Sequence, residues 1–355
     1  MSRTFMVKRD DLTHSRLNDS APLSAAADEV VLAIESFALT ANNITYAVAG
    51  NMIGYWKFFP SADGWGQIPV WGIGKVVDSG HSDISPGTRF YGYFPMAEQL
   101  RVQPVDVNPR GFKDGAAHRA ELPPVYNQYS AVNAENGFTP GFDDHAMVYR
   151  PLFTTSFVLD DYLADNKFFD TKSIILGSAS SKTAFGLAFM LHQRSDIEVI
   201  GLTSDGNRKF VEKLGLYNTV LTYDAVESLP FEPSVYVDMA GNRQVLGRIH
   251  HHLQDNLKCS CGVGITHWDA RDGEDPATLP GAKPEMFFAP SQIMKRNQEL
   301  GAAQYQALLG AATQAFFARV DNWVQIERHP FEEVQAVYDL VRNGPPADRA
   351  YVIAA

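Results

Sequence analysis

Cysteine is scarce in this sequence: its 355 residues include only two, Cys259 and Cys261. The two stand two positions apart in a stretch with the pattern of a strand, where residues i and i+2 are poorly placed to bridge each other. The sequence therefore argues against a disulfide framework, and a reducing cytoplasm is the predicted compartment.

Long apolar runs and an excess of positive charge are also missing. No uninterrupted apolar stretch reaches the roughly eighteen residues that span a bilayer, and residues 1–11 lack the apolar core of a signal peptide. Acidic residues outnumber basic ones by 41 to 30, which gives a net charge of -11. These absences argue against nucleic acid or membrane as the main partner, although a local basic pocket for an anionic cofactor stays open.

The distribution of strand and helix patterns divides the chain in two. Stretches of β-branched and aromatic residues lie between Gly/Pro turns in the first hundred residues, which predicts a strand-rich domain. Residues 103–150 hold five prolines and few aliphatic runs, which predicts a long loop-like insertion. From residue 172 onward, strands alternate with helices, which predicts a doubly wound parallel sheet. Further helices are expected over 152–163, 302–319 and 330–342, with a final strand over 351–354.

Glycine is missing where a dinucleotide site most needs it. Residues 173–176 have the pattern of a buried strand and 183–191 that of an apolar helix, joined by a turn of small residues over 177–182. Serines and Lys182 stand where the glycines of a dinucleotide-binding βαβ unit are expected. Small side chains still let the backbone approach a pyrophosphate, and the helix start offers N–H groups and a positive dipole end. A plain strand–turn–helix with a solvated lysine fits the same segment.

A Walker A loop is a competing interpretation of this turn, because a glycine precedes the Lys-Thr pair. That loop requires the spacing Gly-x-x-x-x-Gly-Lys. Lys182 is one residue too close to Gly177, and Ser181 replaces the second glycine. The spacing therefore argues against this interpretation.

The end of the next strand predicts which nucleotide would bind. A cofactor with a free ribose 2′-hydroxyl favours an acidic residue there, whereas Thr203 and Ser204 are neutral and are followed by Arg208 and Lys209. This set suits a 2′-phosphate and predicts NADP(H). Asp205 keeps NAD(H) open, since its carboxylate could meet a ribose diol.

Several segments, in a shared order, resemble the signatures of one enzyme superfamily. Residues 68–80 resemble P-x-x-x-G-x-E-x-x-G-x-V, 85–90 resemble G-D-R-V, 213–223 resemble L-G-A-D-x-V-I-x-Y, and 235–241 resemble V-x-x-D-x-x-G. On these motifs the chain resembles the medium-chain dehydrogenase/reductase superfamily, in its zinc-independent, quinone-oxidoreductase-like branch. Phrases within 125–157 further resemble a divergent, largely uncharacterised branch of it.

The resemblance implies an α/β fold of two domains with the cofactor in the cleft between them. A GroES-like, β-rich catalytic domain would take residues 1–155 and 305–355, and a doubly wound Rossmann domain residues 156–304. The resemblance also favours a homodimer formed through the Rossmann domains. Carried over by position, the cofactor residues are Ser178, Ser180, Ser181, Lys182 and Thr183 at the pyrophosphate; Thr203, Ser204, Arg208 and Tyr223 at the adenosine and its 2′-phosphate; and Ala240, Gly262, Val263, Gly264 and Phe288 along the nicotinamide half.

Metal-binding patterns are scarce as well. Zinc-dependent members of the superfamily use four cysteines in a structural site, which two cysteines cannot make. Cys259 and Cys261 are better read as small residues of a core strand or of the cofactor wall. His250, His251 and His252 are adjacent, so on a helix they point in different directions and do not converge on one ion. No metal is expected.

Without zinc, polarising a carbonyl requires hydrogen-bond donors or a proton source. Residues 40–46 resemble the family's L-N-x-x-D segment, with Asn42 at the asparagine and Tyr46 at a tyrosine that lines the pocket in quinone-reductase-like members. In the insertion, His118 could act as a general acid, and Arg119 could hold an oxygen-rich substrate. A core tyrosine and an ordinary loop hydrogen-bond network are the alternatives. Further candidates for the substrate pocket are Tyr126, Asn127, Tyr129 and Trp56.

The leading hypothesis is an NADPH-dependent, zinc-independent reductase of a quinone, enone or related activated carbonyl compound. It would work by hydride transfer, with a proton from Tyr46, His118 or water. Two other hypotheses keep the fold. One is a non-redox acid/base enzyme that cleaves a C–C bond or hydrates its substrate through His118, and the other is a ligand-binding protein.

Overall fold

The computed structural model describes residues 1–51, 54–239, 241–263 and 273–355. The chain divides into two compact units: unit 1 comprises Met1–Val148 and Gln325–Ala355, and unit 2 comprises Tyr149–Val324. The sequence predicts junctions at 155/156 and 304/305, somewhat inside unit 2. The predicted α/β class, with a β-rich part and a parallel sheet, is confirmed. Within the described ranges, no helix is long and apolar enough to cross a bilayer.

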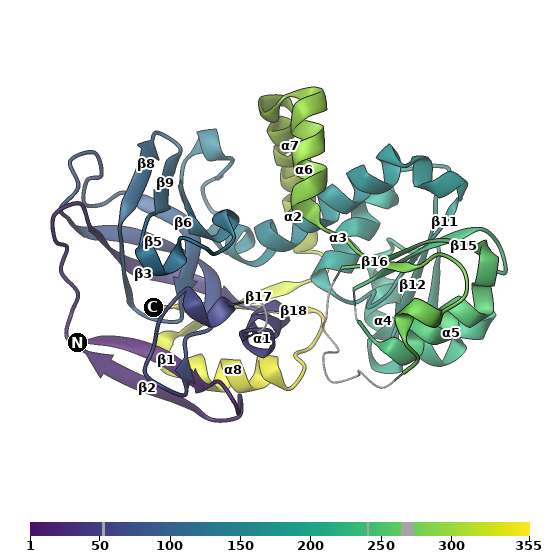
Figure 1. The fold of residues 1–355 in the computed structure, drawn as a ribbon, viewed down its shortest axis with the longest axis horizontal. Helices are drawn as coiled ribbons and strands as arrows, with labels where there is room; N and C mark the ends of the chain where they lie inside the picture. Colours follow the sequence, from purple (N-terminus) through teal and green to yellow (C-terminus); the bar gives the residue numbers. More distant parts are fainter. Residues whose placement is uncertain (52–53, 240, 264–272) are drawn as a thin grey trace. The chain divides into compact units, whose positions relative to one another are not determined.

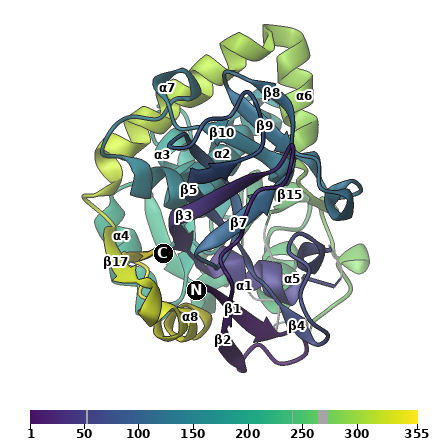
Figure 2. The same cartoon turned by 90° about the vertical axis from the view of Figure 1, so that its left-hand side faces the viewer.

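Unit 1 is built mainly from antiparallel strands. Its strands are β1 (Ser2–Lys8), β2 (Ser15–Ser20), β3 (Val30–Leu39), β4 (Trp65–Gly66), β5 (Pro69–Ser79), β6 (Arg89–Pro95), β7 (Gln99–Val102), β8 (Pro104–Asn108), β9 (Gly111–Asp114), β10 (Gln128–Ala131), β17 (Gln325–Pro330) and β18 (Arg349–Ala354). Its α-helices are α1 (Ala41–Val48) and α8 (Val334–Arg342). The main sheet has the order β17-β18-β3-β5-β6-β10-β9-β8, with β7 also paired to β3, and β2-β1-β4 form a smaller sheet. Figure 2 shows β3, β5 and β7 side by side.

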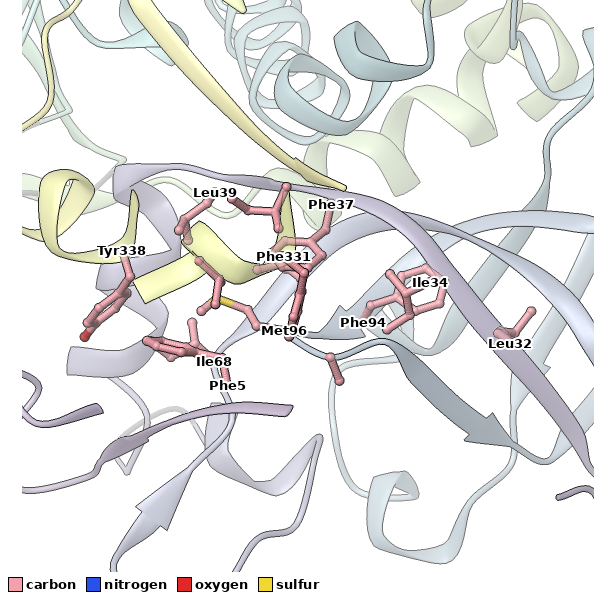
Figure 3. Close-up of a cluster of buried hydrophobic side chains, with 14 of the residues drawn as sticks. Phe5, Leu32, Ile34, Phe37, Leu39, Ile68, Phe94, Met96, Phe331 and Tyr338 are labelled. Atoms are coloured by element: carbon pink, nitrogen blue, oxygen red, sulfur yellow. The ribbon is translucent and has the colours of Figure 1, made fainter. Parts of the chain in front are cut away.

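The core of unit 1 gathers aliphatic and aromatic side chains from segments far apart in the sequence. Phe37 of β3, Phe94 of β6 and Phe331 before α8 are all buried in one cluster, together with Phe5 and Tyr338 (Figure 3). Burying such side chains stabilises the fold by about 1.5–3 kcal/mol each. The core therefore ties the C-terminal segment to the first strands.

The structure places strands where the sequence predicts a loop-like insertion. Strands β8, β9 and β10 lie within residues 103–150 and continue the main sheet outward from β6. Pro104 begins β8, the outermost strand, where a missing backbone N–H costs no ladder hydrogen bond. The prediction of a loop-like insertion was therefore wrong for these three strands. It relied on proline content, and prolines at a sheet edge do not exclude strands.

Unit 2 is a parallel sheet with helices packed against it (Figure 1). Its strands are β11 (Ser173–Leu176), β12 (Glu198–Thr203), β13 (Thr219–Thr222), β14 (Ser234–Asp238), β15 (Leu257–Gly262) and β16 (Pro284–Met286). Its helices are α2 (Asp143–Asp165, which begins in unit 1), α3 (Lys182–Leu191), α4 (Asp205–Leu214), α5 (Arg243–Leu253), α6 (Ala289–Leu300) and α7 (Ala302–Val320). The order β13-β12-β11-β14-β15-β16 is that of a doubly wound dinucleotide-binding sheet.

Two sets of side chains attach the helices to this sheet. Ile249 and Leu253 of α5 pack with Ile175 of β11 in one buried cluster. Aromatic rings join α2, α3 and α7: Phe316 stacks on Phe153 at a centroid distance of 4.4 Å. Phe185 of α3 joins the same cluster, with its ring centroid 6.2 Å from that of Phe316, so these rings hold the helix that follows the glycine-poor turn.

Candidate functional site

The carboxyl ends of strands β11 to β15 meet at one edge of the unit 2 sheet, because these strands are parallel neighbours. We call this edge, with the turns that follow the strands, the strand-end edge. Ligands of doubly wound sheets bind outside such an edge, where the strand order reverses. Here the order reverses between β11 and β14, beside the turn at 177–181.

The turn between β11 and α3 is shaped by small residues. A Cβ at Gly177 would lie 2.7 Å from the Tyr236 hydroxyl, so only glycine fits there. Ser178 has a φ of 51°, a left-handed conformation that glycine adopts more easily. The Ser181 hydroxyl accepts from the N–H of Ala184 and caps α3. The chain thus builds this turn with serines, and Lys182 begins the helix.

We expect Gly177→Ala to destabilise the protein by about 1–3 kcal/mol, because the buried Tyr236 ring must shift to admit the methyl group. Urea unfolding measures the change in the free energy of unfolding. Gly206→Ala is the matched control, since a Cβ there meets no atom within 4 Å, and it should be neutral or slightly stabilising. Equal stability of the two variants would contradict this account of the turn.

Three polar side chains form hydrogen bonds with the turn: Tyr223 follows β13, Asn207 is on α4, and Tyr217 precedes β13. The hydroxyl of Tyr223 accepts from the N–H of Ser178 at 3.1 Å. The Asn207 amide donates to the Ser180 hydroxyl at 3.1 Å, and the Tyr217 hydroxyl donates to the Ala179 carbonyl at 2.8 Å. Sequence reasoning found Tyr223 but missed Asn207 and Tyr217, which carry no pattern that singles them out.

The residues predicted for a 2′-phosphate lie at the end of β12 and just after it, and they differ in exposure and in their hydrogen-bond partners. Thr203 is buried, and its hydroxyl has no hydrogen-bond partner among the described residues. Ser204 is exposed at the N-cap of α4, and its side chain makes no capping bond. Arg208 is half exposed and pairs with Glu212 at 2.9 Å. Ser204 and Arg208 are therefore within reach of a ligand, whereas the Thr203 side chain lies inside the sheet.

The residues predicted for the nicotinamide half are dispersed. Gly262 ends β15, and the N–H of Val263 donates to the Asp238 carbonyl, so both lie at the strand-end edge. Ala240 and Gly264 lie outside the described residues. Phe288 is 65% exposed at the N-cap of α6 and lines a separate pocket of about 450 Å³ with Cys259 and Cys261. Burial raises the pKa of Cys259 to about 11, which keeps its thiol protonated.

Unit 1 gathers aromatic side chains around the hydroxyl of Tyr46. We call this group the tyrosine box; its members are Tyr46, Tyr55, Phe58, Trp71, Tyr93 and Tyr126. Ring centroids lie 4.5 Å apart for Tyr46 and Tyr55 and 4.7 Å apart for Tyr93 and Tyr126. Such spacings and tilted rings are favourable for aromatic pairs.

Tyr46 and Asn42 face each other because they are four residues apart on α1. The Asn42 amide nitrogen donates to the Tyr46 hydroxyl at 2.7 Å. With this amide orientation, the phenolic proton of Tyr46 is left for another acceptor. Burial raises the pKa of Tyr46 above its ordinary range, so the side chain holds its proton at neutral pH. The pair can therefore present one O–H donor to a substrate oxygen.

The predicted acid His118 and three predicted pocket residues form a polar network beside the box. Arg119 and Tyr129 are buried in it, whereas His118 is exposed. Arg119 is 1% exposed and forms an ion pair with Asp114 at 3.1 Å. Its guanidinium also donates to the Phe58 carbonyl and to the Tyr129 hydroxyl. His118 contacts the same Phe58 carbonyl at 3.2 Å, and Asn127 donates to the Arg119 carbonyl. These partners hold the network to the backbone.

The remaining predicted residue, Trp56, packs in the hydrophobic core of unit 1, over Gly50 and Gly66. Tyr129 belongs to the same core, and burial raises its pKa to about 12. Of the predicted catalytic and pocket residues, the box contains Tyr46 and Tyr126. Sequence reasoning missed Tyr55 and Tyr93; Tyr93 of β6 is the direct cross-strand partner of Trp71 on β5.

The three adjacent histidines have separate partners. His250 contacts the Pro280 carbonyl at 2.7 Å and the Ser260 hydroxyl at 2.9 Å. His251 pairs with Glu274, and His252 contacts the Leu229 carbonyl. Among the residues that the structure describes, no group of three or more His, Cys, Asp or Glu side chains is arranged to hold a metal ion.

Comparison with solved structures defines the class of fold. The chain is similar over 99% of its length to CurA from Vibrio vulnificus, solved in complex with NADPH, with a TM-score of 0.65, 12% identity and 99% of that chain covered. It is similar over its whole length to the yhdH oxidoreductase from Salmonella enterica, solved in complex with NADP, with a TM-score of 0.59, 14% identity and full coverage of that chain. It also resembles the quinone oxidoreductase from Coxiella burnetii, with a TM-score of 0.57, 11% identity and 100% and 99% of the two chains covered. The chain therefore has the fold of these oxidoreductases, which confirms the superfamily resemblance at the level of the fold.

A family model places the chain more narrowly. Residues 37–345 match the family described as "Protein of unknown function (DUF2855)", and the chain belongs to this family. No curated protein matches the chain significantly. The predicted placement in a divergent, largely uncharacterised branch is thereby confirmed.

Proposed function

We propose that the protein is an NADPH-dependent oxidoreductase that reduces a quinone, an enone or a related activated carbonyl compound without zinc. The observation that carries this proposal is the Asn42–Tyr46 pair, which holds one protonated hydroxyl inside an aromatic box. The fold it shares with proteins crystallised with NADPH or NADP supports the choice of cofactor. Two cysteines and scattered histidines support chemistry that does not use zinc.

The strand-end edge fits a dinucleotide in its essential features. Gly177 and the serines let the backbone approach a pyrophosphate, and α3 directs its N-terminal end to the same turn. Lys182 would add a positive charge there, and Ser204 with Arg208 would meet the 2′-phosphate. NADPH supplies a hydride when bound, so a carbonyl substrate needs one proton besides. Tyr46 can supply this proton from its hydroxyl, because that group stays protonated.

We expect Lys182→Ala to weaken NADPH binding by about ten- to a hundredfold, because a charge-assisted contact contributes about 1.5–3 kcal/mol. Fluorescence titration of NADPH measures the dissociation constant. Lys172→Ala is the control, since Lys172 precedes β11 at the opposite end of the strand. An unchanged constant for Lys182→Ala would remove this lysine from the cofactor site.

The decisive test is cofactor binding followed by turnover. Absence of binding of NADPH and NADH at millimolar concentration would refute the redox function. If NADPH binds, its oxidation across a panel of quinones and enones separates an enzyme from a binding protein.

We further propose a cytoplasmic homodimer that pairs through unit 2. The outer strand β16 exposes Met286, and the following Phe288 is exposed as well. Light scattering after size exclusion should give twice the mass of one chain, and a monomer would contradict this proposal.

A further inference from the structure

A pocket of about 450 Å³ lies over strands β15 and β16 of unit 2, and we call it the β15–β16 pocket. Its volume is in the range of small-molecule sites. Cys261 of β15 pairs with Glu285 of β16, so both face one side of the sheet, and Cys259 shares this face because it is two positions away. Of the residues expected to hold the cofactor, only Phe288 is among the described residues that line the pocket.

Aromatic rings form the walls of this pocket. The ring of Tyr162, on α2, has its centroid 5.3 Å from that of Phe287 and 5.9 Å from that of Phe169. All three rings are partly exposed and line the pocket. Aromatic rings pack favourably at such distances with further rings. The walls therefore suit a flat, apolar body.

A strained stretch of backbone holds Phe169 in the wall. Four consecutive residues, 167–170, have φ angles between 50° and 55°, a left-handed conformation that bulky side chains avoid. The turn separates two phenylalanines: the Phe168 ring lies 5.1 Å from the guanidinium carbon of Arg194, whereas Phe169 lines the pocket. Such strain persists only where the surroundings hold it, and it is concentrated at functional sites. This observation favours a ligand site over an incidental hollow.

Lysine side chains give the pocket a positive charge, in a chain whose net charge is -11. Lys258, Lys283 and Lys295 line the pocket. Lys295 already forms an ion pair with Asp165. The Lys258 ammonium donates to a backbone carbonyl, which leaves its charge in place. Lys258 and Lys283 together outweigh the one carboxylate in the lining, that of Glu285, by a single positive charge.

We propose that the β15–β16 pocket is a second ligand site, which binds a flat aromatic monoanion, an aryl carboxylate the size of naphthoate. The rings would pack against Tyr162 and Phe169, and the carboxylate would meet Lys258 and Lys283. One negative charge matches the net charge of the lining, whereas a phosphate dianion exceeds it. Lys258 is the second residue of β15 and Lys283 directly precedes β16, so this charge lies at the opposite end of the strands from the strand-end edge. The inference does not rest on the proposed reductase function.

The test titrates the full chain by calorimetry with 2-naphthoate and with 2-naphthalenemethanol, a neutral molecule with the same rings. Naphthoate should bind more tightly than the alcohol. Replacing Lys258 and Lys283 together by alanine should weaken naphthoate binding about tenfold, because an exposed ion pair contributes a factor of up to about five. The same double variant should bind the alcohol like the unmodified protein. Phe169→Ala should weaken the binding of both probes about fivefold, since both lose the same ring contact.

Two single lysine variants are the controls. Lys213→Ala, on α4 and exposed as well, should bind both probes like the unmodified protein. Lys182→Ala should do the same, and weaker naphthoate binding to it would place the probe at the strand-end edge and overturn the inference. Lys258 and Lys283 are exposed, so their double variant should fold even if Phe169→Ala does not. Absence of naphthoate binding at millimolar concentration, or unchanged affinity in the double variant or in a folded Phe169→Ala, would likewise overturn it.

Discussion

Asp114→Ala should lower the free energy of unfolding by about 3–5 kcal/mol, because it leaves the Arg119 guanidinium buried without its counter-charge. The two side chains are 2% and 1% exposed and lie 3.1 Å apart. Asp114 also accepts from the backbone N–H groups of Gln103 and Ala116. Losing these bonds would loosen the link between β8 and the turn that follows β9. Urea unfolding followed by circular dichroism measures the change.

The neighbouring exposed ion pair provides the control for this prediction. Lys113 pairs with Asp106 at 2.7 Å, with side-chain exposures of 46% and 64%. Exposed pairs contribute about 0.2–1 kcal/mol, so Lys113→Ala should change stability by no more than that. If Asp114→Ala proved as mild as Lys113→Ala, the buried pair would not be holding this part of unit 1 together.

The alternation of strands and helices after residue 172 predicted the unit 2 sheet, because buried parallel strands are continuous apolar runs such as Ile174–Leu176. The short strands β8 to β10 escaped prediction for a physical reason. They lie at one side of the main sheet, where prolines are tolerated, and β8 and β10 each bury a single residue. Their local sequence therefore lacks the apolar pattern that identifies a strand.

In the candidate site, too, some features follow from the local sequence and others depend on the whole fold. Asn42 and Tyr46 were each identified from the family segment that residues 40–46 resemble, and the helix α1, which was not predicted, pairs them at a spacing of four residues. Trp71 and Tyr93 meet only through the register of β5 with β6, and register depends on the whole sheet. For Arg119, the residue type alone suggested a role that its position in the fold does not favour. Its charge suggested a substrate contact, but the fold encloses it with Asp114 five positions earlier.

Tyr46→Phe should reduce kcat for quinone reduction about 10²- to 10⁴-fold, the usual contribution of a positioned proton donor. Phenylalanine keeps the ring packed against Tyr55, so the fold should persist. Since burial raises the pKa of Tyr46, this residue should cause no loss of kcat/KM as the pH passes 10, where an ordinary tyrosine would lose its proton. Tyr338→Phe is the matched control, because Tyr338 is equally buried in unit 1 but bonds to the Leu12 carbonyl away from the box. Steady-state NADPH oxidation measures both variants, and a Tyr46→Phe enzyme with unreduced kcat would show that the proton comes from another group.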